Sequence, residues 1–294
     1  MAERLISELL AEARSPLLSY EFFPPKDDAG MDQFKKVAEA LKPTRPDFVT
    51  VTFGAGGSTR ASTFQACQHL REAGHTPVMH HLTCVGSSRD ELASIIDSVY
   101  DAGMRNIMAL RGDPPKGETR FRPHPDGLGH ANDLVRFIKK RHPDICCGVA
   151  GYPETHQEAL SPESDILYLK DKVDMGGAFV TTQLFYDNRS FYDFTKRARE
   201  WGIRAPILPG LLPPISLKQL RRMASMCGAA LPAALVRALE KAGDDPDKAQ
   251  EVGINWTVNQ IKDLLKHDVP GIHLYILNRS KAPLAPALKE CFGR

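Results

Sequence analysis

Polar residues that could transfer protons or bind a ligand occur repeatedly at the ends of apolar runs in this 294-residue chain. They stand in the segments EFFPP (residues 21–25), RGDPP (111–115), YPETH (152–156) and NR (278–279), and at Gln183 within TTQLFYD. Carboxyl and imidazole groups can act as general acids or bases. Guanidinium groups and amides can bind an anionic or polar ligand. Gathered in one place, these residues would form an enzyme active site.

Glu21 is the strongest candidate for the proton donor. Phe22, Phe23 and two prolines follow it in the sequence, and an apolar environment disfavours the charged form of a carboxyl group. A general acid that works near neutral pH needs this property. The alternative is that Glu21 is a strand residue in a structural ion pair, since such pairs also perturb carboxyl groups. The residues alone leave both interpretations open.

Two further patterns are weaker. GAGGST at residues 54–59 follows an apolar run but lacks both the G-x-G-x-x-G spacing and the lysine of a P-loop. A phosphate contact and a turn with Ser58 or Thr59 as a helix N-cap are both open. His80 and His81 are adjacent, so in a strand they face opposite sides and cannot both bind one ion. We therefore predict no metal site.

The elements that would position these residues are eight apolar, β-rich runs with helical periodicity between them. The runs lie near Leu17, Phe48, Val78, Ile107, Val149, Val180, Ile207 and Leu274. Apolar runs without strict alternation are typical of strands covered on both faces, as in parallel sheets. The pattern predicts an α/β fold, a single (β/α)8 TIM barrel over residues 1–294. Extra helices are expected between strands 7 and 8, at about 232–243 and 246–267.

In such a barrel the active site forms at the carboxyl ends of the strands, where the polar segments above would meet. Of the pair His80 and His81, we expect one to face the barrel mouth and the other the helical layer. Ser88 with Glu91 predicts a capping box, and Ser161 followed by Pro162 predicts another helix start. The first 16 residues predict an amphipathic helix packed on the body of the protein.

Composition excludes several classes of protein. A net charge of +2 gives no basic face for nucleic acid, and no stretch approaches the roughly 20 apolar residues of a membrane helix. The six cysteines include no C-x-x-C pair, and a chain of this size needs no disulfides. We therefore expect small buried thiols in a reducing compartment, the cytoplasm.

The motifs taken together are similar to those of the methylenetetrahydrofolate reductase family. They run in order from SYEFFPPK (19–26) through NIMALRGDPP (106–115), AGYPETH (150–156), DILYLKDKVDMGGAFVTTQLFYD (165–187) and PILPGLLP (206–213) to HLYILNR (273–279). The resemblance implies a (β/α)8 barrel that binds FAD noncovalently and forms homo-oligomers. It implies ping-pong reduction of 5,10-methylenetetrahydrofolate to 5-methyltetrahydrofolate, with NADH or NADPH as the electron donor. The role would be in one-carbon metabolism and methionine synthesis.

The resemblance also assigns residue roles. Glu21 matches the general acid that protonates folate N10, and Asp113 matches a carboxylate near the flavin and the pterin. The matches to substrate-binding positions are Asp113, Gln183, Gln219 and Arg279. Positions that match FAD-binding residues are Thr52, Phe53, His81, Leu110, Arg111, Gly112, Asp113, His130, Ala131, Tyr152, His156, Asp165, Tyr168 and Lys172.

Two rival functions differ in class. One is a barrel methyltransferase that acts on folate with zinc or a corrinoid partner, which His and Cys ligand spacing would support. The other is a non-catalytic binding or scaffold barrel, for which polar residues at so many strand ends would have no use. The chain ends soon after the predicted barrel, so we expect no C-terminal regulatory domain and no inhibition by S-adenosylmethionine. The choice between NADH and NADPH and the oligomeric state stay open.

Overall fold

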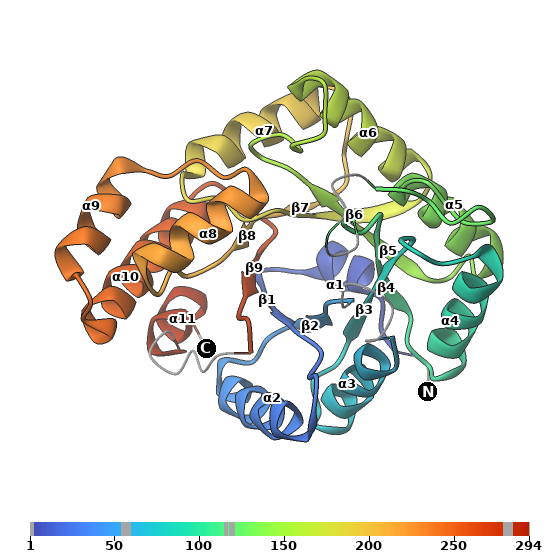
Figure 1. The fold of residues 1–294 in the computed structure, drawn as a ribbon, viewed down its shortest axis with the longest axis horizontal. Helices are drawn as coiled ribbons and strands as arrows, with labels where there is room; N and C mark the ends of the chain where they lie inside the picture. The colour runs from blue at the N-terminus through green and yellow to red at the C-terminus, as the bar shows by residue number, and fades with distance from the viewer. Residues whose placement is uncertain (1–2, 54–59, 115–116, 118–120, 279–284, 294) are drawn as a thin grey trace.

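The computed structural model describes residues 3–53, 60–114, 117, 121–278 and 285–293. Nine parallel strands form one sheet that curls into a barrel surrounded by helices (Figure 1). The strands are β1 (Leu17–Phe22), β2 (Phe48–Val51), β3 (Val78–Thr83), β4 (Asn106–Leu110), β5 (Cys146–Gly151), β6 (Gly177–Thr182), β7 (Ile207–Leu208), β8 (Gly210–Leu211) and β9 (Gly271–Tyr275). Each of the eight predicted runs forms a strand, so the predicted (β/α)8 architecture is confirmed.

The seventh strand position is divided in two by Pro209. β7 pairs with β6 on one side of this residue, and β8 pairs with β9 on the other. Proline has no backbone N–H for a strand ladder, but its carbonyl can still accept a hydrogen bond. Here the Pro209 carbonyl accepts one from His273 N at 3.0 Å. The segment 207–211 therefore bridges β6 and β9 and closes the barrel.

Helices pack around the outer face of the barrel, apart from α1, which covers its amino end. They are α1 (Ile6–Glu12), α2 (Asp28–Leu41), η1 (Lys42–Thr44), α3 (Arg60–Glu72), α4 (Arg89–Asp101), α5 (Ala131–Arg141), α6 (Pro162–Asp174), α7 (Asn188–Glu200), α8 (Leu217–Cys227), α9 (Ala233–Ala242), α10 (Pro246–Leu265) and α11 (Ala285–Phe292). The group α8, α9 and α10 lies together on one side, coloured orange to red-orange in Figure 1. These helices stand between the seventh strand position and β9, which confirms the predicted extra helices.

The predicted helix starts are present. Ser88 caps α4, accepting a hydrogen bond from Glu91 N while the Glu91 carboxylate accepts one from Ser88 N. Ser161 caps α6, with Pro162 as the first helical residue. Each cap satisfies backbone N–H groups that a helix end leaves without a partner. Short polar signals in the sequence thus fix where these helices begin.

The barrel interior is apolar at the amino end of the strands. Alternate residues of each strand point inward, and the first inward layer holds Leu17, Phe48, Met79, Met108, Cys146, Phe179 and Leu208. Helix α1 packs against this layer through Ile6, which is fully buried, and Leu9. Ile6 N also donates a hydrogen bond to Asn106 Oδ1 at 2.8 Å. The predicted amphipathic helix therefore covers the amino end of the barrel.

Within the part of the chain that the structure describes, no helix is both long and apolar enough to span a membrane.

Candidate active site

Above the apolar layer, the barrel interior becomes polar. The inward residues there include Ser19, Thr50, His81, Thr83, Thr181 and His273, all buried. Within the described residues, four of their side-chain atoms have no hydrogen-bond partner: Thr50 Oγ1, His81 Nε2, Thr83 Oγ1 and Thr181 Oγ1. A buried polar group without a partner costs about 1–3 kcal/mol. Such a concentration at the carboxyl end of the strands is typical of a site completed by a ligand.

Glu21 lies in this polar region, but its surroundings differ from the expected ones. Strand alternation turns Phe22 away from Glu21 into the helical layer, where its ring centroid is 5.3 Å from that of Phe34. Phe23 is 40% exposed. The idea that these two rings wall the carboxyl group is therefore wrong. Instead, Glu21 Oε2 lies 3.3 Å from His273 Nε2 and 3.7 Å from His81 Nε2.

The two adjacent histidines of β3 separate as predicted. His81 faces the barrel interior beside Glu21, and burial lowers its pKa to about 4, so it is uncharged near neutral pH. His80 faces the helical layer, 6.3 Å from Phe53 between ring centroids, and burial lowers its pKa to about 3. Of these two histidines, only His81 can therefore contact a ligand inside the barrel.

The turn after β4 brings Arg111, Gly112 and Asp113 to the barrel mouth. Gly112 has a positive φ of 90°, and a Cβ atom there would stand 2.8 Å from Val85 Cγ1. Only glycine fits this turn without strain. Asp113 is exposed. Burial raises the pKa of Tyr152, and the negative charges of Asp165 and Asp113 raise it further. Asp113 is therefore close enough to Tyr152 for their charges to interact.

Arg111 already has an anionic partner. Its two terminal nitrogens donate to the carboxylate of Glu158 at 2.6 and 2.8 Å, and this pairing raises the pKa of Arg111. The guanidinium also lies 4.9 Å from the centre of the Phe121 ring. An incoming phosphate can bind the same guanidinium in the same bidentate way. Binding there would exchange the exposed Glu158 carboxylate for the ligand.

A second group of candidate residues gathers where β5 ends and α6 passes. Lys172 Nζ donates to the Ala150 carbonyl at 2.5 Å and lies 5.8 Å from the centre of the Tyr152 ring. The rings of Tyr152 and His156 meet edge to face at 4.6 Å. His156 N donates to Asp165 Oδ2 at 3.0 Å, and burial raises the pKa of Asp165. The structure therefore brings together Tyr152, His156, Asp165 and Lys172.

Lys172 gives a testable prediction, because burial lowers its pKa to about 8. In the unfolded chain a lysine titrates near pH 10.4, so between about pH 8 and 10.4 the unfolded state binds more protons. Folding stability contributed by this group therefore rises with pH across that window. We expect Lys172→Met to raise the melting temperature of the ligand-free protein by about 2–4 °C at pH 7. The gain should shrink towards pH 10. Lys170→Met, on the exposed side of α6, is the control, and a gain independent of pH would contradict the prediction.

The other residues that the resemblance assigns to FAD lie at the ends of β2 and β4 and on or next to helices α5 and α6. Thr52 follows β2, and both its N and its Oγ1 donate to the Phe22 carbonyl, at 2.9 and 3.2 Å. Leu110 ends β4 and is half-buried. His130 is the exposed N-cap residue of α5, and Ala131 is its first residue. Tyr168 stands on α6 with 61% of its surface exposed.

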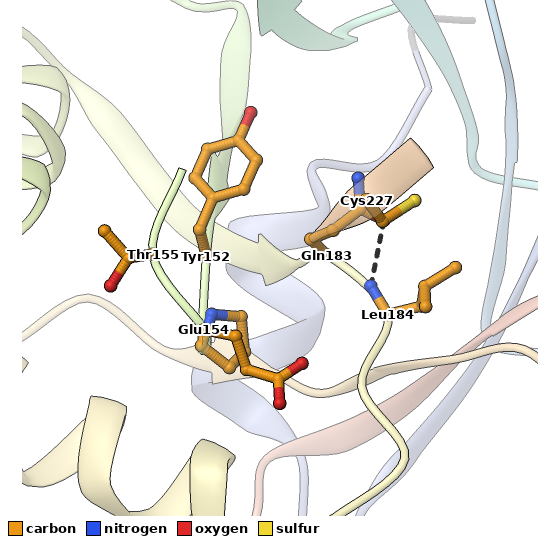
Figure 2. A pocket seen from close by; sticks show the side chains of 7 residues that line it. Tyr152, Glu154, Thr155, Gln183, Leu184 and Cys227 are labelled. Atoms are coloured by element: carbon orange, nitrogen blue, oxygen red, sulfur yellow. Dashed lines mark hydrogen bonds between the residues drawn. The ribbon is translucent and has the colours of Figure 1, made fainter. Parts of the chain in front are cut away.

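The residues expected to bind substrate differ in their positions and in their hydrogen bonds. Gln183 follows β6 and lines a small pocket together with Tyr152, Pro153, Glu154, Thr155, Leu184 and Cys227 (Figure 2). Its Oε1 accepts a hydrogen bond from Leu184 N at 2.9 Å, the dashed line in Figure 2. Gln219 Oε1 accepts one from Ile215 N at the start of α8. That side chain therefore has a capping role. Arg279 and the GAGGST segment lie outside the described residues.

Several residues of this region were not found from the sequence. Ser19 and His273 join Glu21 inside the barrel, and Cys227 enters the pocket from α8. Ser19 and Glu21 are two residues apart on β1, so they share a face. That spacing could have revealed Ser19, but nothing local in the sequence connects either residue to β9.

Comparison with known proteins gives one consistent result. A model of the family described as "Methylenetetrahydrofolate reductase" matches residues 6–287. The 5,10-methylenetetrahydrofolate reductase of Escherichia coli K12 is 34% identical over 95% of this chain and 93% of its own. Methylenetetrahydrofolate reductase (NADH) 1 of Arabidopsis thaliana is 35% identical over 94% of this chain but only 48% of its own, so the chain spans about half of that relative.

Solved structures show the fold independently. An uncharacterized protein from Clostridium thermocellum, described as binding two copies of 5-methyl-5,6,7,8-tetrahydrofolic acid, aligns with a TM-score of 0.65 at 16% identity, over 98% of each chain. A 2,3-dimethylmalate lyase aligns with a TM-score of 0.52 at 12% identity, over 97% of this chain. At these identities the similarity concerns the barrel alone.

Proposed function

The chain belongs to the methylenetetrahydrofolate reductase family, and on that premise we propose that it reduces 5,10-methylenetetrahydrofolate to 5-methyltetrahydrofolate. The observation that carries the proposal is the position of Glu21. It is a buried carboxyl group at the carboxyl end of the barrel, beside two histidines and several buried hydroxyl groups without partners. A barrel that served only as a scaffold would gain nothing from this arrangement, because each unpaired group destabilises it.

We propose FAD as the bound cofactor, and the residues present fit such a group. Arg111 and Lys172 provide cations on one side of the mouth, suited to a pyrophosphate. The buried Asp165 carboxylate can accept a hydrogen bond from a ribose hydroxyl. Thr50 Oγ1, His81 Nε2 and Thr83 Oγ1 are polar atoms without partners in the described structure, available to a flavin ring. Bound FAD would supply the hydride carrier between the nicotinamide and the folate.

The chain's own residues supply proton transfer and charge stabilisation. Glu21 would protonate folate N10, making that nitrogen a better leaving group as the five-membered ring opens. Asp113, a carboxylate at the mouth, would stabilise the positive charge that develops on the substrate as a 5-iminium cation. Gln183 would orient the pterin from the end of β6, with Gln219 and Arg279 as further contacts. The fixed positions of the strand ends keep these groups in place during the reaction.

Several finer features belong to the same proposal. The electron donor is NADH or NADPH, and the two half-reactions alternate in a ping-pong order. Residues 1–294 form a single barrel domain that assembles into homo-oligomers and serves methionine synthesis in the cytoplasm. The six cysteines are free, four of them buried, which supports a reducing compartment. The plant relatives named for NADH support a nicotinamide donor for this chain as well.

The first test is the identity of the cofactor. We expect the purified protein to be yellow and to release FAD, and not FMN, on denaturation, because Arg111 and Lys172 suit the pyrophosphate that FMN lacks. Chromatography of the released flavin decides the identity. An anaerobic assay should then show bleaching of the flavin by one or both nicotinamides and its reoxidation by methylenetetrahydrofolate. FMN in the extract, or no flavin even after reconstitution, would refute the proposal. A colourless protein that contains zinc would favour the methyltransferase alternative.

A further inference from the structure

A chain of buried polar side chains links Glu21 on β1 to the neighbouring strand β9. β1 and β9 pair in parallel, with Ser19 opposite His273 and Glu21 opposite Tyr275. His273 Nδ1 lies 2.8 Å from Ser19 Oγ, and His273 Nε2 lies 3.3 Å from Glu21 Oε2. Ser19 and His273 are fully buried, and Glu21 is 7% exposed. Each ring nitrogen of His273 therefore has one defined partner.

The Ser19 hydroxyl has two acceptors within hydrogen-bond distance, His273 Nδ1 at 2.8 Å and the Ile272 carbonyl at 3.3 Å. When its single proton goes to Ile272, its oxygen presents a lone pair to His273, so that Nδ1 carries the imidazole proton. A neutral imidazole with its proton on Nδ1 is an acceptor at Nε2. The contact between His273 Nε2 and Glu21 is then a hydrogen bond only if the carboxyl group donates.

The other titratable groups facing Glu21 do not provide a competing proton. From β3, His81 is uncharged near neutral pH, and its Nε2 stands beyond hydrogen-bond distance at 3.7 Å. From β9, the Tyr275 hydroxyl donates to the Thr182 carbonyl at 2.6 Å, and burial raises its pKa. From β2, Thr50 stands opposite Glu21 in the strand register and carries no charge. Among the described residues, His273 alone lies within hydrogen-bond distance of the Glu21 side chain.

We propose that His273, oriented by Ser19, is a positioning residue that holds the Glu21 carboxyl group in its proton-carrying form until that proton is delivered to the substrate. The role of the proton rests on the proposed function. In this mechanism the neutral carboxyl group is favoured by a hydrogen-bond acceptor, and not by an apolar environment. Removing the Ser19 hydroxyl would free the imidazole to move its proton to Nε2, which then favours the carboxylate.

The hydrogen-bond pattern can be measured without any reaction. Nitrogen-15 NMR of protein labelled at histidine distinguishes protonated from bare ring nitrogens, and His273→Gln identifies the signals of His273 among the ten histidines. We expect the proton on Nδ1 in the wild type and in Ser19→Thr, which keeps the hydroxyl group. In Ser19→Ala we expect it to move to Nε2. A wild-type proton on Nε2 would overturn the proposal.

The kinetic consequence is measured by stopped flow on the flavin-loaded enzyme. We expect Ser19→Ala to slow reoxidation by methylenetetrahydrofolate about 10- to 100-fold, as for a misplaced catalytic group. Reduction by the nicotinamide should keep close to its wild-type rate, and Ser19→Thr should restore most of the loss. Thr257→Val is the control, since it removes a buried hydroxyl group that donates to the Gly253 carbonyl within α10. Equal slowing of both half-reactions would overturn the positioning role. A wild-type enzyme that folate never reoxidises would refute the proposed function, while the NMR result would still decide the proton pattern.

Discussion

Glu21→Gln is expected to leave one half of the reaction intact and to disable the other. Transfer of hydride from a nicotinamide to flavin requires no proton on a substrate nitrogen, so the variant should bind FAD and be bleached at close to the normal rate. Opening the folate ring does require a proton on N10, and glutamine cannot supply one. Reoxidation by methylenetetrahydrofolate should therefore fall by about 10²- to 10⁴-fold, the loss typical of a missing general acid.

Stopped-flow traces of the two half-reactions test this directly. Glu3→Gln is a suitable control, because Glu3 is also a buried carboxyl group but accepts a hydrogen bond from Val78 N at the opposite end of the barrel. If both half-reactions slow equally in Glu21→Gln, the carboxyl group supports the structure of the site. If neither slows, another residue is the acid. Both results would contradict the role proposed for Glu21.

Asp113→Asn has the second largest expected effect. The substitution removes a negative charge from the barrel mouth while keeping the size of the side chain. We expect the flavin to become easier to reduce, with a higher potential, because a negative charge disfavours the electron-rich reduced form. Delivery of hydride to folate should slow, because the cationic iminium loses stabilisation. Preorganised contacts of this kind contribute about 2.7–4 kcal/mol, which corresponds to about 10²- to 10³-fold in rate.

The two effects of Asp113→Asn are measured separately, by redox titration and by the folate half-reaction. The Asp144→Asn variant controls for a simple change of net charge, since Asp144 is paired with Arg105 at 3.4 Å, away from the mouth. An unchanged potential together with an unchanged folate half-reaction would show that Asp113 has only a structural role.

The sequence predicted the frame of the protein well because its signals are local. Parallel strands covered on both faces produce apolar runs, and the capping residues Ser88 and Ser161 mark helix starts within a few residues. The separation of His80 from His81 follows from strand alternation alone. Even the extra helices α9 and α10 carry their own proline and glycine punctuation.

The environment of each site residue was harder to predict, because it depends on contacts between distant segments. Glu21 meets His273 only because β1 pairs with β9, 252 residues away. The pairing of Arg111 with Glu158 depends on the course of the loop after β5. Gln219 was expected to contact substrate, and in the structure its side chain accepts a hydrogen bond from Ile215 N at the start of α8. The sequence shows which residue types are present, but not the strand pairing and loop courses that bring them into contact.

Helix α1 limits the routes by which substrates can reach the interior of the barrel. Ile6, Leu9 and the apolar layer beneath them fill the amino end of the barrel, so that end offers no route to Glu21 through the described residues. Under the proposed function, the electron donor and the folate would therefore both enter and leave through the carboxyl end of the barrel. If they bind there in turn, as in the proposed ping-pong order, steady-state rates should give parallel lines in double-reciprocal plots.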